Sequence, residues 1–114
     1  QARMGAITPP DPDVTVEVEA GPIRPLFKAH EGTMELLEVA QRVARDVGLD
    51  LDHGQFGGGS DGNFTGALGV PTLDGLGVVG NGVHTKQEHL LVSSLAPRAM
   101  LFAGLVAALS DRNV

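Results

Sequence analysis

The feature that most limits what this chain can fold into is a long stretch rich in glycine. Sixteen of its 114 residues are glycine, about twice the usual share of roughly 7%. Most of them lie between Gly48 and Gly82. Because glycine marks turns and weakens helices and strands, we expect only short elements joined by loops in this stretch.

One clear helix is predicted before the glycine-rich stretch, over Thr33 to Val47. Thr33 is a plausible N-cap, and Gly48 is placed to end the helix as a left-handed C-cap. Apolar residues recur on one face at helical spacing: Leu36, Leu37, Ala40, Val43, Ala44 and Val47.

A second helix is predicted after that stretch, over Leu95 to Leu109. Ser94 is its expected N-cap, and Pro97 is tolerated in the first turn, where its missing N–H has no helical partner to lose. The longest apolar run, Ala99 to Leu109, is shorter than the about 20 residues that a bilayer requires. We therefore expect a buried helix and no membrane span.

The remaining segments predict short strands and turns. Val14, Val16 and Val18 alternate with polar residues, which favours a half-exposed strand. Residues 21–25 read as an extended linker, since two prolines stiffen them. Further weak elements are a helical end at residues 2–7, strands at 49–56 and 70–73, a short helix at 62–68 and a helical turn at 85–91. Alternating strands and helices favour an α/β fold class.

The composition narrows the possible partners. The chain has 8 basic against 14 acidic residues and a formal net charge of -6, which argues against nucleic acid and anionic membrane surfaces. Cysteine is absent, so any metal ion must be held by His, Asp or Glu. We expect no nucleic-acid partner and no membrane partner.

The run from Gly57 to Asp61 is the first candidate site. Its glycines allow backbone N–H groups to turn toward an anion, and the N-terminus of the following helix adds partial positive charge. The alternative is an ordinary strand-to-helix turn with Ser60 or Asp61 as its cap. No Gly-Lys-Ser/Thr follows, so the run is not a phosphate-binding P-loop.

Two further residues are candidates for binding chemistry. His84 follows a glycine loop, a typical presentation of a metal ligand or a proton-transfer group. It does not form a His-Glu-x-x-His motif with Glu88 and His89, so a self-contained zinc site is not expected. Arg24 lies between two prolines and could be held in place for a carboxylate, or it could be a solvated linker arginine. Asp74 could support a metal-binding histidine or form a turn.

Three blocks of sequence in this order and spacing closely resemble one known family. The blocks are Gly57 to Phe64, Gly69 to Gly77 and Gly82 to His89. The family is the zinc-dependent exopeptidases and deacylases, which include glutamate carboxypeptidase, acetylornithine deacetylase, succinyl-diaminopimelate desuccinylase and aminoacylase. The Arg24-Pro25 segment resembles the glutamate carboxypeptidase-like branch in particular.

The resemblance covers essentially this whole chain but only the C-terminal quarter to third of a family member. It implies an α/β fold that forms the C-terminal part of a zinc-exopeptidase-like catalytic domain. By this likeness, residues 1–20 are the end of an inserted lid or dimerisation domain. Residues 21–114 then belong to the catalytic domain.

The resemblance also implies roles for particular residues. His84 matches the last metal-ligand histidine, which binds one of two zinc ions, and Arg24 matches an arginine that takes the substrate's carboxylate. Gly58, Gly59 and Ser60 match a loop lining the substrate pocket. The family's other ligands and its general base lie upstream, so no catalytic residue is expected in this chain. Asn81, where glycine is frequent, and His89, where an aromatic residue is common, depart from the family pattern.

These observations together predict a fragment of a dinuclear zinc hydrolase that cleaves an amide bond next to a free carboxylate in a small peptide. One alternative is an N-acyl amino acid deacylase of the same family. Another is a non-catalytic, truncated binding or assembly module. We expect the chain alone to be inactive and to bind zinc weakly, because catalytic zinc usually takes three protein ligands. We also expect a homo-oligomer, since the apolar helix at 95–109 lacks cover.

Overall fold

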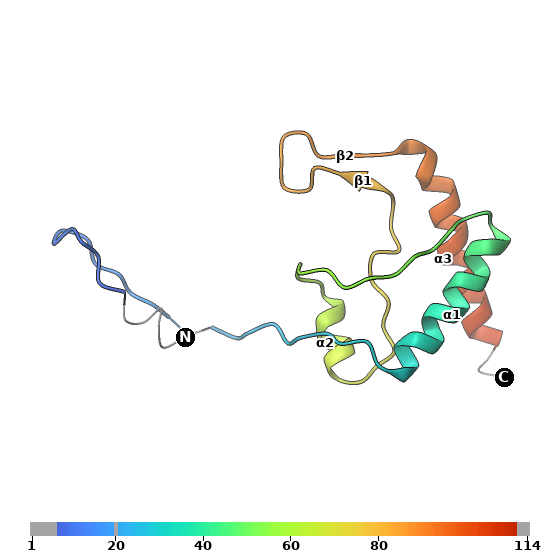
Figure 1. Ribbon diagram of the computed structural model, residues 1–114, viewed down its shortest axis with the longest axis horizontal. Coiled ribbons are helices and arrows are strands. Elements are labelled where there is room, and N and C mark those ends of the chain that lie inside the picture. Colours follow the sequence, from blue (N-terminus) through green and yellow to red (C-terminus); the bar gives the residue numbers. More distant parts are fainter. Residues whose placement is uncertain (1–6, 20, 112–114) are drawn as a thin grey trace.

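Two long helices that pack side by side form the body of the computed structural model, which describes residues 7–19 and 21–111 (Figure 1). They are α1 (Glu31–Asp46) and α3 (Leu95–Ser110). The elements between them are short: α2 (Gly62–Ala67), β1 (Gly80–Asn81), β2 (His89–Leu90) and the 3-10 turn η1 (Val92–Ser94). β1 and β2 form an antiparallel hairpin in which Gly80 lies opposite Leu90.

Helix α1 begins two residues before the predicted start. His30 is the N-cap in extended conformation, and the Met34 N–H donates the first helical bond to the His30 carbonyl at 3.0 Å. The prediction of Thr33 as N-cap is therefore wrong. The helix instead begins at Glu31, whose acidic side chain in the first turn suits the helix dipole. Thr33 is buried within the first turn instead.

The C-terminus of α1 is confirmed as predicted. Gly48 has a left-handed φ of 73°. Its N–H donates to the Arg45 carbonyl at 3.1 Å, and the Leu49 N–H donates to the Ala44 carbonyl at 2.8 Å. This pair of bonds is the Schellman arrangement, which satisfies carbonyls that the helix itself leaves unpaired.

The contact between α1 and α3 contains most of the buried apolar side chains. Leu37, Ala40 and Ala44 of the predicted face are buried, whereas its other three members are half-buried. Val39 is also buried, although the predicted face omits it. Gly104 allows a close approach, since a Cβ there would lie 2.6 Å from Cγ1 of Val43. The core thus depends on a small residue at the crossing.

Helix α3 is less buried than the sequence predicts. Of its residues, Leu101 and Leu105 are buried, whereas Phe102 is 58% exposed and Met100 and Val106 are each 50% exposed. Ser94 precedes the helix as predicted, but its hydroxyl does not cap it. It accepts from the Val79 N–H at 3.0 Å and donates to the Leu91 carbonyl at 2.7 Å.

With η1, the helical segment Val92–Ser110 reaches 19 residues with a mean hydropathy of 1.6. By length and composition alone this segment could cross a membrane. The apolar run from Ala99 to Leu109, on which the expectation of no membrane span was based, is therefore shorter than the apolar helical segment that the structure shows. The core helix of a soluble protein satisfies the same test, and this helix packs on α1. The absence of a membrane partner stays a prediction.

The strands predicted at 14–18, 49–56 and 70–73 are not formed within the described ranges. A strand needs a neighbour to accept and donate its backbone hydrogen bonds, and the described part of the chain gives these segments none. Residues 7–19 lie apart from the helices (Figure 1). Of the α/β fold class expected from the sequence, the described residues thus show helices and one two-stranded sheet.

Two of these extended segments cover the helix pair. Leu51, Leu73 and Leu76 pack against the core cluster of Val39, Ala40 and Leu105. The Gln41 side chain donates to the Leu51 carbonyl at 3.0 Å and ties the first segment to α1.

The other short elements predicted from the sequence have different outcomes. Helix α2 is confirmed to within one residue. The helical turn predicted at 85–91 is wrong, because turns at the hairpin tip lead into β2 there. The predicted helical end at residues 2–7 falls, except for Ile7, outside the described residues.

The close contact between Gly104 and Val43 predicts that the effect of an alanine at position 104 on stability depends on the residue at position 43. Gly104→Ala should lower the free energy of unfolding by about 1 kcal/mol, because overpacking costs about 1–3 kcal/mol and alanine returns about 1 kcal/mol of helix propensity. In a Val43→Ala background the same change should stabilise the protein. Urea unfolding followed by circular dichroism measures both effects. The same loss in both backgrounds would contradict the proposed contact.

Candidate substrate and metal site

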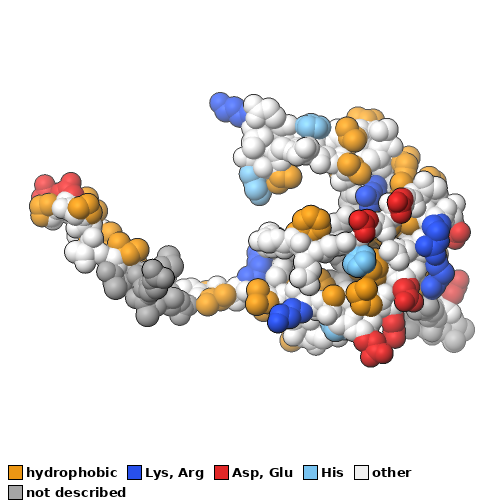
Figure 2. Space-filling view, in the orientation of Figure 1, with side chains coloured by type: hydrophobic (Ala, Val, Ile, Leu, Met, Phe, Trp, Pro, Cys, Tyr) orange, Lys and Arg blue, Asp and Glu red, His pale blue; other side chains and the backbone are white. Residues whose placement is uncertain are grey.

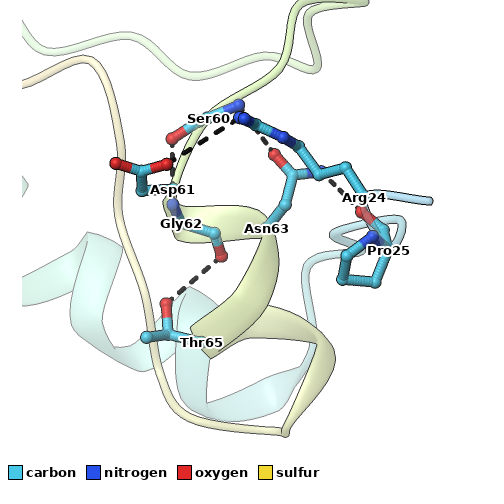
Figure 3. Close-up of polar contacts among 7 residues, drawn as sticks. All are labelled: Arg24, Pro25, Ser60, Asp61, Gly62, Asn63 and Thr65. Atoms are coloured by element: carbon cyan, nitrogen blue, oxygen red, sulfur yellow. Dashed lines mark hydrogen bonds and ion pairs between the residues drawn. The ribbon is translucent and has the colours of Figure 1, made fainter. Parts of the chain in front are cut away.

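Asn63 connects two segments that resemble parts of a substrate site (Figure 3). Its side-chain N–H donates to the Pro25 carbonyl at 2.8 Å, and its side-chain oxygen accepts from the Ser60 N–H at 2.9 Å. The Ser60 hydroxyl in turn accepts from the Gly62 N–H at 3.0 Å. We call the two bonds made by Asn63 the Asn63 bridge. It places the Arg24-Pro25 segment beside the glycine loop.

Arg24 lies over this glycine loop. Its Nη1 is 3.9 Å from Oδ1 of Asp61, and its Cζ is 5.6 Å from the centre of the Phe64 ring. A Cβ at Gly59 would lie 3.2 Å from the same nitrogen. The Asp61 side chain is 99% exposed and that of Arg24 is 45% exposed, so this ion pair is weak. The guanidinium therefore lies close to the glycine loop and the Phe64 ring and is still accessible to an anionic ligand.

Phe27 fixes the same segment from the other end. A Cβ on the buried Gly66 of α2 would overlap the Phe27 ring. Glycine at this position lets the ring lie directly on the helix backbone. The segment from Arg24 to Phe27 is thus held to α2 by both a hydrogen bond and an apolar contact.

Gly58, Gly59 and Ser60 line a cavity of about 730 Å³. The cavity is also lined by Thr33 of α1, by Arg98 of α3 and by the segments at 50–56 and 72–76. Asp74 lines the cavity too. Its carboxylate accepts from the Gly75 N–H at 2.8 Å, which favours the second of its two predicted roles, that of a turn residue. Gly58, Gly59 and Ser60 therefore lie along one hollow, whereas Arg24 is not among the residues that line it, and their role in substrate binding stays a prediction.

His84 lies at the tip of the β1–β2 hairpin, which projects from the rest of the molecule across an open notch (Figure 2). The tip is built on glycine: a Cβ at Gly82 would lie 2.8 Å from the Gln87 carbonyl oxygen. Thr85 donates from both its N–H and its hydroxyl to the Gly82 carbonyl, at 3.0 and 2.7 Å. His84 has a φ of 64°, the one positive value outside glycine within the described ranges.

This backbone angle at His84 points to a constrained position. Left-handed conformations outside glycine cost of order 1–3 kcal/mol and cluster at functional sites. The imidazole is exposed and therefore accessible to a metal ion. In the part of the chain that the structure describes, no group of three or more His, Asp or Glu side chains could hold a metal. Within the described residues, His84 therefore has no second and third side chain beside it with which to hold a metal ion, and its role as a ligand stays a prediction.

The other histidines lie elsewhere. His53 is on the surface beside Asp52, with 4.0 Å between Nδ1 and Oδ1. His89 is exposed, and its Nδ1 lies 2.8 Å from the Gln87 carbonyl oxygen. His30 caps α1.

Asn63, Phe64 and Phe27 are site residues that the sequence reasoning did not single out. A local sequence pattern could have identified Asn63. Ser60 and Asn63 are three residues apart, as in a capping box, in which the later side chain accepts a hydrogen bond from the earlier residue's N–H. The bond from Asn63 to Pro25 spans 38 residues, and no local pattern predicts it.

Comparison with known proteins gives consistent matches. The family described as Peptidase family M20/M25/M40 matches residues 4–108. Carboxypeptidase G2 of Pseudomonas sp. (strain RS-16) is 33% identical over 99 residues, which cover 85% of this chain and 23% of that protein. Succinyl-diaminopimelate desuccinylase of Thioalkalivibrio sulfidiphilus (strain HL-EbGR7) is 32% identical over 81 residues, which cover 70% of this chain and 21% of that protein.

A third relative is the uncharacterized protein YqjE of Bacillus subtilis (strain 168), which is 31% identical over 90 residues, covering 79% of this chain and 24% of YqjE. The chain thus spans about a quarter or less of the length of these relatives. No solved structure gives a significant match.

The contact of Phe27 with Gly66 yields a prediction on stability. Gly66→Ala should lower the free energy of unfolding by about 1–3 kcal/mol, because its methyl group overlaps the ring. Gly57→Ala is the matched control, since nothing lies within 4 Å of a Cβ there. Thermal unfolding of the two variants measures the difference. Equal midpoints would show that the ring does not depend on this glycine.

Proposed function

Because the chain belongs to peptidase family M20/M25/M40, we propose that it is the C-terminal part of a two-zinc hydrolase. The proposed reaction is cleavage of an amide bond next to a free carboxylate. The observation that carries this proposal is Arg24, held over the glycine loop beside the cavity and still open to solvent. The carboxypeptidase and desuccinylase names of two relatives support the same class of reaction.

In this proposal Arg24 binds the substrate's carboxylate. A guanidinium can donate two parallel hydrogen bonds to a carboxylate, which fixes orientation as well as position. Binding energy from this remote group then holds the scissile amide at the reacting centre. Gly58 and Gly59 carry no side chains, so the substrate can approach their backbone closely.

The residues of this chain fit one ligand position of a zinc ion. His84 presents an exposed imidazole on a constrained turn, and in a chain without cysteine imidazole and carboxylate are the available donors. When bound, zinc polarises a carbonyl and lowers the pKa of a water molecule. The remaining ligands and the general base are assigned to the upstream part of the longer protein.

The division into two domains is also a proposal. Residues 1–20 are assigned to the end of an inserted lid or dimerisation domain, and residues 21–114 to the catalytic domain. Two features support this boundary: residues 14–18 are exposed and form no helix or strand, and residues 7–19 lie apart from the helices (Figure 1). A strand pattern without a strand partner fits the edge of a sheet formed by other residues.

A deacylase acting on N-acyl amino acids is the second candidate, favoured by the desuccinylase relative. Both reactions leave a free carboxylate for Arg24, so comparing the hydrolysis of small peptides with that of N-acyl amino acids decides between them.

Self-association is proposed as well, because Phe102 and Val106 leave an apolar face on α3 uncovered. Light scattering on the purified chain tests it. A monomer at high concentration would contradict it.

His84→Ala in the full-length protein should lower the zinc content by about one ion and reduce kcat to near background, because one ion loses a ligand. Elemental analysis and steady-state kinetics measure the two effects. His89→Ala is the control, since that exposed ring lies against the Gln87 carbonyl oxygen and does not line the cavity. Unchanged zinc content and kcat in His84→Ala would remove it from the metal site.

For a substrate with a free carboxylate, Arg24→Ala should reduce kcat/KM by the equivalent of about 2–4 kcal/mol of transition-state binding, the scale for losing one partner of a charge pair that the bound substrate would bury. The loss for the matching amidated substrate should be small. Lys28→Ala removes a nearby exposed charge and serves as the control. Equal losses on both substrates would make Arg24 a structural residue.

A further inference from the structure

We propose that Asn63 is a positioning residue that sets the preference for a carboxylate substrate by holding Arg24 over the glycine loop. This inference rests on the proposed function, because it assigns the preference to Arg24. It adds a residue to which neither the sequence pattern nor the comparisons give a role. Asn63 also lines the cavity, but both ends of its amide are already hydrogen-bonded to the protein, so the claim concerns how it positions Arg24.

The Asn63 bridge uses both ends of one amide group. The N–H end holds the Pro25 carbonyl at 2.8 Å, and the oxygen end holds the Ser60 N–H at 2.9 Å. Pro25 has no N–H of its own, so its carbonyl is the one backbone group through which it can be held. Because Arg24 directly precedes it, this bond fixes the backbone from which the guanidinium extends.

Other contacts of Arg24 cannot replace this bond. The Asp61 carboxylate is 3.9 Å away and 99% exposed, and solvent weakens such a pair. The Phe64 ring attracts the guanidinium at 5.6 Å without fixing its direction. Within residues 7–19 and 21–111, the bond from Asn63 is the one hydrogen bond between the segment at 21–30 and the segment at 57–67.

The second bond of the bridge aligns the loop with the arginine. Ser60 and Gly59 line the cavity, and Arg24 lies against Gly59. A single side chain is therefore bonded both to the Arg24-Pro25 segment and to Ser60 of the glycine loop (Figure 3). A substrate held by Arg24 would then enter the cavity at a fixed depth.

Asn63→Asp separates the two bonds. The carboxylate has nearly the same shape and still accepts from the Ser60 N–H, but it has no N–H for Pro25 and places an oxygen against that carbonyl. Asn63→Ala removes both bonds and adds no charge. Thr65→Val is the matched control on α2, because Thr65 bonds to Gly62 and Thr72 and not to the Arg24 segment.

The test uses the full-length protein with a carboxylate substrate and its amidated counterpart. Both Asn63 variants should raise KM for the carboxylate substrate about tenfold, the scale for one lost hydrogen bond. The kinetics of the amidated substrate and of Thr65→Val should stay unchanged. Adding either Asn63 variant to Arg24→Ala should cause no further loss, because residues that act through one another are not additive.

Several results would overturn the inference. These are equal losses on both substrates, additive losses with Arg24→Ala, or an effect confined to Asn63→Asp, which would come from the new charge. If Arg24→Ala retains the carboxylate preference, the role of Arg24 in the proposed function fails and this inference fails with it. If Arg24→Ala loses the preference and neither Asn63 variant does, the inference alone fails.

Discussion

The close approach of α1 and α3 at Gly104 is the contact on which the rest of the described structure depends. It brings Val39, Ala40 and Leu105 into one cluster, and the extended segments at 49–56 and 70–76 lie over that cluster through a few leucines. These segments lead to the glycine loop and to the hairpin. Because the loop and the hairpin bury little of their own surface, the helix pair provides the support on which both are placed.

The candidate site is held by a different kind of contact. One asparagine side chain joins two segments, a phenylalanine ring lies on a glycine, and an arginine lies over a glycine loop. Two of these contacts account for a glycine: a Cβ at Gly66 would overlap the Phe27 ring, and a Cβ at Gly59 would lie 3.2 Å from Nη1 of Arg24. The described residues include an accessible guanidinium at Arg24 and an exposed imidazole at His84 but no group of three metal-ligating side chains, which is consistent with a chain that spans about a quarter of its relatives.

Local features were predictable from the sequence, and features that need distant partners were not. The periodicity of α1, the left-handed Gly48 and the short helix after the glycine run follow from neighbouring residues alone. The strands expected at 49–56 and 70–73 depend on a neighbouring strand, and the burial of α3 depends on what covers Phe102 and Val106. Thr33 shows a local failure, because residues before it extend the helix. The resemblance pointed to Arg24 and the glycine loop, but it did not show the bridge between them.

The most direct test is a crystal structure of the full-length protein with zinc and an amino acid product bound. The account predicts that the product's carboxylate lies on the Arg24 guanidinium, with the Asn63 bridge intact and the His84 imidazole bound to a zinc ion. A product carboxylate held by other residues, with His84 away from the metal, would contradict it.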